Sequence, residues 1–144
     1  MVLVTVRDWP SGRVAARNLE DDGTLAINVG RAPGDRRLID DLTATIGTVF
    51  PSVYVMDIPN TFNSIIYATK KPTTSKNLTS NLTALMGNLN THPLLLQAGI
   101  TALANLKPVS SGGVVFTDDL APIEWITNDM VLRFMLEGGI KSLQ

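Results

Sequence analysis

The chain has 144 residues, 44% of them hydrophobic and 17% charged, a balance that is typical of a globular domain and excludes an intrinsically disordered chain. The formal net charge of −1 argues against a nucleic-acid partner, because such proteins present a basic surface. The absence of cysteine excludes a disulfide framework and thiolate chemistry. The longest apolar stretch, Leu94–Leu106, is too short to span a bilayer, and Arg7 ends the apolar start too early for a signal peptide. We therefore expect a cytoplasmic protein with no membrane partner.

Residues 1–23 carry the weakest pattern. Val2–Val6 predicts a strand, Val14–Leu19 a short helix and Glu20–Gly23 a loop. The helical part is too short for an ordinary crossover between parallel neighbours, which usually takes a dozen or more residues. The beginning of the chain is therefore expected to be an incomplete or irregular part of the fold.

The next segment predicts a strand followed by a helix. Thr24–Val29 is a nearly uncharged apolar run, as expected for a strand covered on both faces. The turn Gly30–Asp35 breaks it, and Asp35 is the expected helix N-cap. Apolar residues then recur at helical spacing until Pro51 stops the helix. They are Leu38, Ile39, Leu42, Ile46 and Val49.

Two β-rich runs follow, Ser52–Asp57 and Ser64–Thr69. Ile58–Asn63 offers too few residues for a second crossover, so these runs are expected to form an antiparallel hairpin. A strand–helix–strand unit of this length is usually a right-handed crossover on one sheet. The pattern predicts the α/β class.

Lys70–Ser75 is a polar linker that divides residues 1–71, the sheet part, from residues 72–144, a helical region packed on the same domain. Two helices are expected after it, Leu78–Leu89 with a cap at Ser75 and Pro93–Leu106 with a cap at Thr91. The second is apolar nearly all round, so it should be buried or lie against a partner. Further along, the sequence predicts a short strand or extended run at Gly113–Phe116 and a last helix at about Asn128–Glu137.

Three motifs carry a family resemblance: LEDDGTLAINVGRAPGD, FPSVYVMDIPNTFNSIIYATKKP and FTDDLAPIEW. The first two follow the order of the last strands of the class I S-adenosylmethionine-dependent methyltransferase fold, and the third resembles a TDD-x-AP-x-E motif. Together they resemble the C-terminal part of spermidine synthase-like proteins, which are polyamine aminopropyltransferases, over roughly residues 17–137. The resemblance implies a partial Rossmann-like sheet, the C-terminal half of that fold, in which an antiparallel last strand is inserted beside the fifth.

The family's donor site is missing from the sequence. A Gly-rich loop after the first strand would let the backbone approach the donor, and an acidic residue would bind its ribose. Here Gly23, Gly30 and Gly34 surround Thr24–Val29 instead, and Asp8 is the sole candidate for the family's catalytic Asp, at a position too close to Leu19. We therefore expect no cofactor, leave the catalytic residues unassigned and leave open whether the chain is an enzyme.

Asp118, Asp119 and Glu124 are the candidate substrate-binding residues. By resemblance they would bind a cationic polyamine; the alternative from the residues alone is a hydrogen-bonded turn before the last helix. Their spacing matches no metal-binding loop, so no metal is expected.

Other candidates have structural alternatives that the sequence favours. Asp57 either faces a site at the strand carboxyl ends or caps a turn, and Gly30–Asp35 either binds an anion or is a plain strand-to-helix turn. His92 has no catalytic partner near it in sequence. Trp125 and Phe116 form either a core contact, which the sequence favours, or a stacking platform for a ligand.

Three hypotheses on function follow. The first is the C-terminal portion of an aminopropyltransferase that is inactive alone. The second is a non-catalytic module that forms a homo-oligomer, most simply a dimer, or that completes a partner chain supplying the missing half of the sheet. The third, a complete small enzyme that uses the carboxylates alone, has no support beyond their presence.

Overall fold

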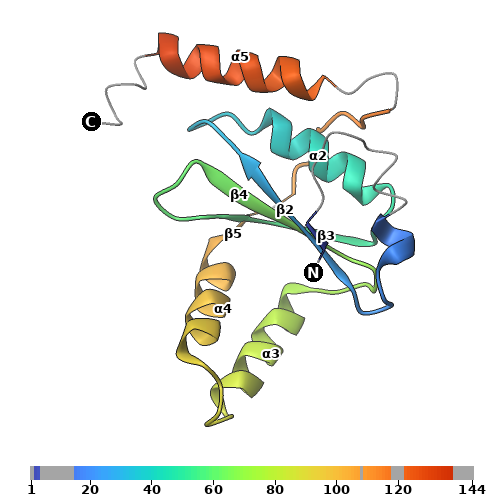
Figure 1. Ribbon diagram of the computed structural model, residues 1–144, viewed down its shortest axis with the longest axis vertical. Helices are drawn as coiled ribbons and strands as arrows, with labels where there is room; N and C mark the ends of the chain where they lie inside the picture. The colour runs from blue at the N-terminus through green and yellow to red at the C-terminus, as the bar shows by residue number, and fades with distance from the viewer. Residues whose placement is uncertain (1, 4–14, 108, 118–121, 138–144) are drawn as a thin grey trace.

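The computed structural model describes residues 2–3, 15–107, 109–117 and 122–137 (Figure 1). It is a mixed α/β structure with one sheet in the order β1-β2-β4-β3-β5. Four strands pair antiparallel, and β1 pairs parallel with β2 at the edge. The strands are β1 (Val2–Leu3), β2 (Thr24–Gly30), β3 (Ser52–Asp57), β4 (Asn63–Thr69) and β5 (Leu106–Lys107).

The predicted hairpin is confirmed. β3 pairs antiparallel with β4, from Ser52 opposite Thr69 to Asp57 opposite Ser64. β4 also pairs antiparallel with β2 along its whole length, so β2 and β3 run in the same direction on either side of it. Helix α2 (Arg37–Gly47) makes the connection from β2 to β3, which confirms the expected strand–helix–strand order.

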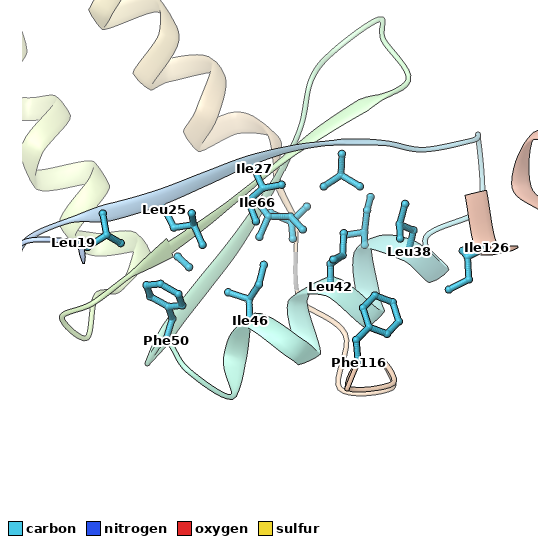
Figure 2. Close-up of a cluster of buried hydrophobic side chains, with 14 residues drawn as sticks. Leu19, Leu25, Ile27, Leu38, Leu42, Ile46, Phe50, Ile66, Phe116 and Ile126 are labelled. Carbon is cyan, nitrogen blue, oxygen red and sulfur yellow. The ribbon is translucent and has the colours of Figure 1, made fainter. Parts of the chain in front are cut away.

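The core lies between one face of the sheet and α2 (Figure 2). Alternate residues of β2 point into it, and they meet the apolar stripe that the sequence predicts for α2. Burying one large aliphatic side chain contributes roughly 1.5–3 kcal/mol, so this layer dominates the stability of the fold. Its largest fully buried hydrophobic side chains are those of Leu25, Ile39, Leu42, Ile46, Val55 and Ile66.

The expectation that Thr24–Val29 is covered on both faces is wrong. Thr24 and Asn28 are exposed and Ala26 is half-buried, whereas the residues between them are buried. The apolar run therefore hides a period of two, because small or polar residues occupy every second position. Helix α2 covers one face of the sheet, and of the helical region it is the helices between residues 75 and 105 that lie on the side of the other face.

Each expected helix cap is one residue away from its observed position. Helix α2 has its N-cap at Arg36, not Asp35. Helix α3 (Ser75–Met86) has its N-cap at Thr74, because the Asn77 side chain accepts hydrogen bonds from the Thr74 N–H and hydroxyl. Helix α4 (Pro93–Asn105) has its N-cap at His92, whose Nδ1 accepts from the Leu94 N–H at 3.2 Å.

Helices α3 and α4 form a hairpin that extends from the side of the sheet opposite α2 (Figure 1). Among the described residues of the hairpin helices, Leu82 of α3 is buried and no residue of α4 is. Of the two alternatives expected for Pro93–Leu106, burial within this chain is wrong, since Leu94, Leu95 and Ile100 are more than half exposed, and contact with a partner stays a prediction. None of the helices in the described residues combines the length and the apolar character needed to cross a membrane.

Helix α5 (Ile123–Leu136) lies beside α2 and begins earlier than the sequence predicts (Figure 1). Ile126 and Met130 are buried, and the Met130 sulfur accepts a hydrogen bond from the Ala32 N–H at 3.2 Å. The rings of Phe62 and Phe134 meet edge to face, with their centroids 5.5 Å apart. These contacts fasten α5 to the loops that follow β2 and β3.

Candidate functional site

The carboxylate of Asp57 is the centre of an ion cluster at the carboxyl ends of β2 and β3. Arg36 Nη1 donates to both of its oxygens, at 3.1 and 2.9 Å, and Ser64 Oγ donates at 2.6 Å. Arg31 Nε lies 3.7 Å from Oδ1. Asp57 is thus at the strand ends, as one of its two predicted roles requires, but it is bound to cations and is not a free carboxylate.

The surroundings of Asp57 keep it ionised. Burial raises the pKa of the carboxyl, but hydrogen bonds from Ser64 and Arg36 and the charges of Arg36 and Arg31 outweigh burial, so its pKa is lowered. Arg31 Nε and Arg36 Nη2 are buried without a hydrogen-bond partner among the described atoms. Both guanidinium groups therefore depend on the charge of Asp57, and the cluster ties the loop after β2 to the β3–β4 hairpin.

A second chain of ion pairs joins the start of α2 to α5. Arg37 Nη2 lies 2.6 Å from Asp35 Oδ2 and 2.7 Å from Asp129 Oδ2. Arg133 Nε lies 2.9 Å from the same oxygen of Asp129. Hydrogen bonding to Arg37 is the largest influence on both carboxylates and lowers the pKa of Asp35 and of Asp129.

The position of Asp35 decides between the two roles predicted for Gly30–Asp35, an anion site and a plain strand-to-helix turn. Asp35 Oδ1 accepts the backbone N–H of Arg37 at 3.2 Å, so a carboxylate of the chain already occupies the first turn of α2. Gly34, with φ of 77°, supplies the left-handed turn that places Asp35 there. The segment is a strand-to-helix turn that supplies its own anion.

The segment Gly113–Phe116, which precedes the candidate carboxylates in the chain, is hydrogen-bonded to helix α2. The Val114 N–H donates to Asp41 Oδ1 at 2.7 Å, and the Phe116 N–H donates to Thr45 Oγ1 at 2.8 Å. A Cβ atom on Gly113 would lie 2.1 Å from the Asp40 carbonyl oxygen, so the segment runs directly against the backbone of α2. Gly113–Phe116 forms no strand, so that one of its two expected forms is wrong, and the segment docks on α2.

Glu124 is exposed in the first turn of α5. Asp118 and Asp119 lie outside the described residues, as does Asp8, so the grouping of the three carboxylates stays a prediction. The described residues contain no group of three His, Cys, Asp or Glu that could hold a metal ion.

The predictions for the aromatic pair Phe116 and Trp125 are confirmed for one residue and wrong for the other. Phe116 is buried in the core, as expected, but Trp125 is 65% exposed, so the expected core contact between them is wrong. Trp125 sits on the outward side of α5, which turns Ile126 inward instead. His92 is exposed and acts as the N-cap of α4.

Sequence reasoning missed a cavity of about 540 Å³ on the second face of the sheet. Tyr54 and Tyr67, directly opposite each other on β3 and β4, form part of one wall. Ala98, Gly99 and Ala102 of α4 form part of another. The alternation of Tyr54 with Val55 and of Ile66 with Tyr67 was the signal that these strands have two differently covered faces.

Comparisons of the chain with protein-family models, with curated proteins and with solved structures find no match.

Proposed function

We propose that this chain is the C-terminal portion of a spermidine synthase-like aminopropyltransferase, that it lacks the donor-binding half and that it is inactive alone. The strand order carries the proposal. β4 is inserted antiparallel between β2 and β3, next to the strand that the motifs match to the fifth of the family's Rossmann-like sheet. The parallel edge strand β1 would then face the missing half of the sheet.

Among the described residues, the two aspartates near the carboxyl ends of the strands are not available as a catalytic carboxylate. A carboxylate that positions and deprotonates an amine must have oxygen lone pairs available to it. At the ends of β2 and β3, Asp57 is bound to Arg36 and Ser64, and Asp35 is bound to Arg37. The sequence also has no Gly-rich loop to bind the donor.

Calorimetric titration with S-adenosylmethionine, its decarboxylated form, putrescine and spermidine tests the proposal. We expect no heat from either donor, and a polyamine response that depends on the three candidate carboxylates. Donor binding in the micromolar range would overturn the proposal, because it would require a donor site without the Gly-rich loop.

The chain offers a matched control for the polyamine part. The variant D118N/D119N/E124Q should abolish the response to spermidine and putrescine. The variant E20Q/D21N/D22N removes three carboxylates from an exposed loop and should leave the response intact. An equal loss of polyamine binding in both variants would mean that the chain binds polyamines through its net charge and not at a site.

A second candidate function, a homo-oligomeric module, has an observation of its own. Helices α4 and α5 expose large apolar side chains on their outer surfaces. These are Leu94, Leu95, Ile100, Trp125, Val131, Leu132, Met135 and Leu136. Light scattering coupled to size exclusion should then give a dimer mass, whereas a monomer at every concentration contradicts this candidate.

A further inference from the structure

The cavity on the second face of the sheet, called the slot below, is lined by the sheet and by helices α3 and α4. One wall is the sheet, where Tyr54, Tyr67 and Met56 line it. Helices α3 and α4 line the rest, and the residues of α4 that do so are the small Ala98, Gly99 and Ala102. Its volume of about 540 Å³ falls within the range of roughly 300–1,000 Å³ that small-molecule sites occupy.

The contact between α3 and α4 explains why the slot stays open. A Cβ atom on Gly99 would lie 3.0 Å from Leu82 Cδ1, so α4 packs closely against the one buried side chain of α3. Ala98 and Ala102, one turn apart, leave space between α4 and the sheet. A leucine at either position would project into that space.

The two tyrosine hydroxyl groups that line the slot differ in whether they are hydrogen-bonded within the chain. The Tyr54 hydroxyl donates to the Thr73 carbonyl, and the Thr73 hydroxyl lies 3.0 Å from that of Thr69, so this end is internally hydrogen-bonded. The Tyr67 hydroxyl lacks a hydrogen-bond partner among the described residues. A tyrosine, with an ordinary pKa of about 10, is protonated at neutral pH, and burial raises the pKa of Tyr67 further, so its hydroxyl can donate a hydrogen bond to a bound molecule.

Charge further limits what the slot can bind. The charged residues that line it, Asp22 and Lys71, are both exposed and carry opposite signs. Being exposed and opposite in sign, they favour neither a cation nor an anion, and a charged ligand between the tyrosines and α4 would lose its hydration without a buried ion pair in return. Two neighbouring tyrosine side chains, whose aromatic rings pack well against other flat rings, and a wall of small side chains favour a flat molecule.

We propose that this slot binds a neutral, planar, largely apolar small molecule that accepts a hydrogen bond from the Tyr67 hydroxyl. The site lies on the face of the sheet opposite α2, away from the ion cluster at Asp57, and does not depend on the proposed relation to aminopropyltransferases.

Nile red is a suitable probe, since it is neutral, planar and fluorescent in apolar surroundings, and its carbonyl accepts hydrogen bonds. We expect saturable binding to the wild-type chain at one site. A102L should weaken binding at least tenfold by filling the slot. Y67F keeps the ring and removes the donor, so it should weaken binding about two- to tenfold.

Leu94→Ser is the matched control, because Leu94 is an exposed apolar residue of α4 that does not line the slot. It should bind the dye as the wild-type chain does. Binding that survives A102L, or that is lost in Leu94→Ser, would place the dye on the outer apolar surface and overturn the proposal, as would the absence of binding by the wild-type chain. Circular dichroism checks that A102L is folded; if it is not, A98L on the same side of α4 replaces it.

Discussion

Asp57 shows how one side chain couples two loops through charge. Asp57→Asn keeps the shape of the side chain but leaves the guanidinium groups of Arg36 and Arg31 without their anion. Removing one partner of a fully buried pair costs about 3–5 kcal/mol, and partial exposure of Arg36 lowers this, so we expect a loss of about 1–3 kcal/mol at pH 7. Urea unfolding measures it.

The same cluster predicts a pH dependence of the free energy of unfolding. Because the pKa of Asp57 in the folded chain is lowered from the value of about 3.9 for a free Asp, its contribution is present above that value and is lost as the pH falls through the folded pKa. The difference between wild type and Asp57→Asn should therefore shrink below about pH 4. Asp21→Asn, at an 86% exposed side chain, is the control and should change little at any pH. A difference for Asp57→Asn that is constant down to pH 2 would exclude charge as its origin.

The extended run before α5 depends on its close approach to α2. Gly113→Ala places a methyl group against the Asp40 carbonyl, a backbone atom that cannot rotate away, so the run must move and its hydrogen bonds to Asp41 and Thr45 must lengthen. We expect a loss of about 1–3 kcal/mol in urea unfolding. Gly112→Ala is the matched control, since its nearest neighbour would be the Ser110 hydroxyl at an ordinary 3.5 Å. Equal stability of the two variants would mean that the run is not held against α2.

The elements that could be predicted are those whose information is local. β3, β4 and the stripe of α2 follow from short-range periodicity and from turn residues such as Asn60, which adopts φ of 59°. Caps were misplaced by one residue because neighbouring polar residues, such as Thr74 and Ser75, are both acceptable caps in sequence, and only the backbone conformation decides between them. The exposure of α4 could not be predicted, because apolar character does not determine which element comes to cover it. The Asp57 cluster and the slot join residues from separate elements, so no local pattern contains them.

Taken as a whole, the molecule has one well-buried layer and one hairpin that is weakly attached to it. The strands β2, β3 and β4 with α2 contain most of the buried residues, whereas Leu82 is the buried residue of the described hairpin helices. Hydrogen exchange should therefore show two levels of protection. We expect amides of α4 to exchange at least about a hundredfold faster than those of β4, an opening free energy lower by roughly 3 kcal/mol.

The same experiment separates the two ways in which the hairpin can be covered. If chains associate through the exposed apolar residues of α4, its protection rises with protein concentration, because association stabilises the closed hairpin by mass action. If a small molecule fills the slot between α4 and Tyr67, the protection of α4 rises as Nile red is added at a fixed, low protein concentration. The Leu94→Ser variant should show the same rise, whereas A102L should not. Equal protection of α4 and β4 at every concentration, without dye, would contradict the division of the molecule into a buried layer and a loosely held hairpin.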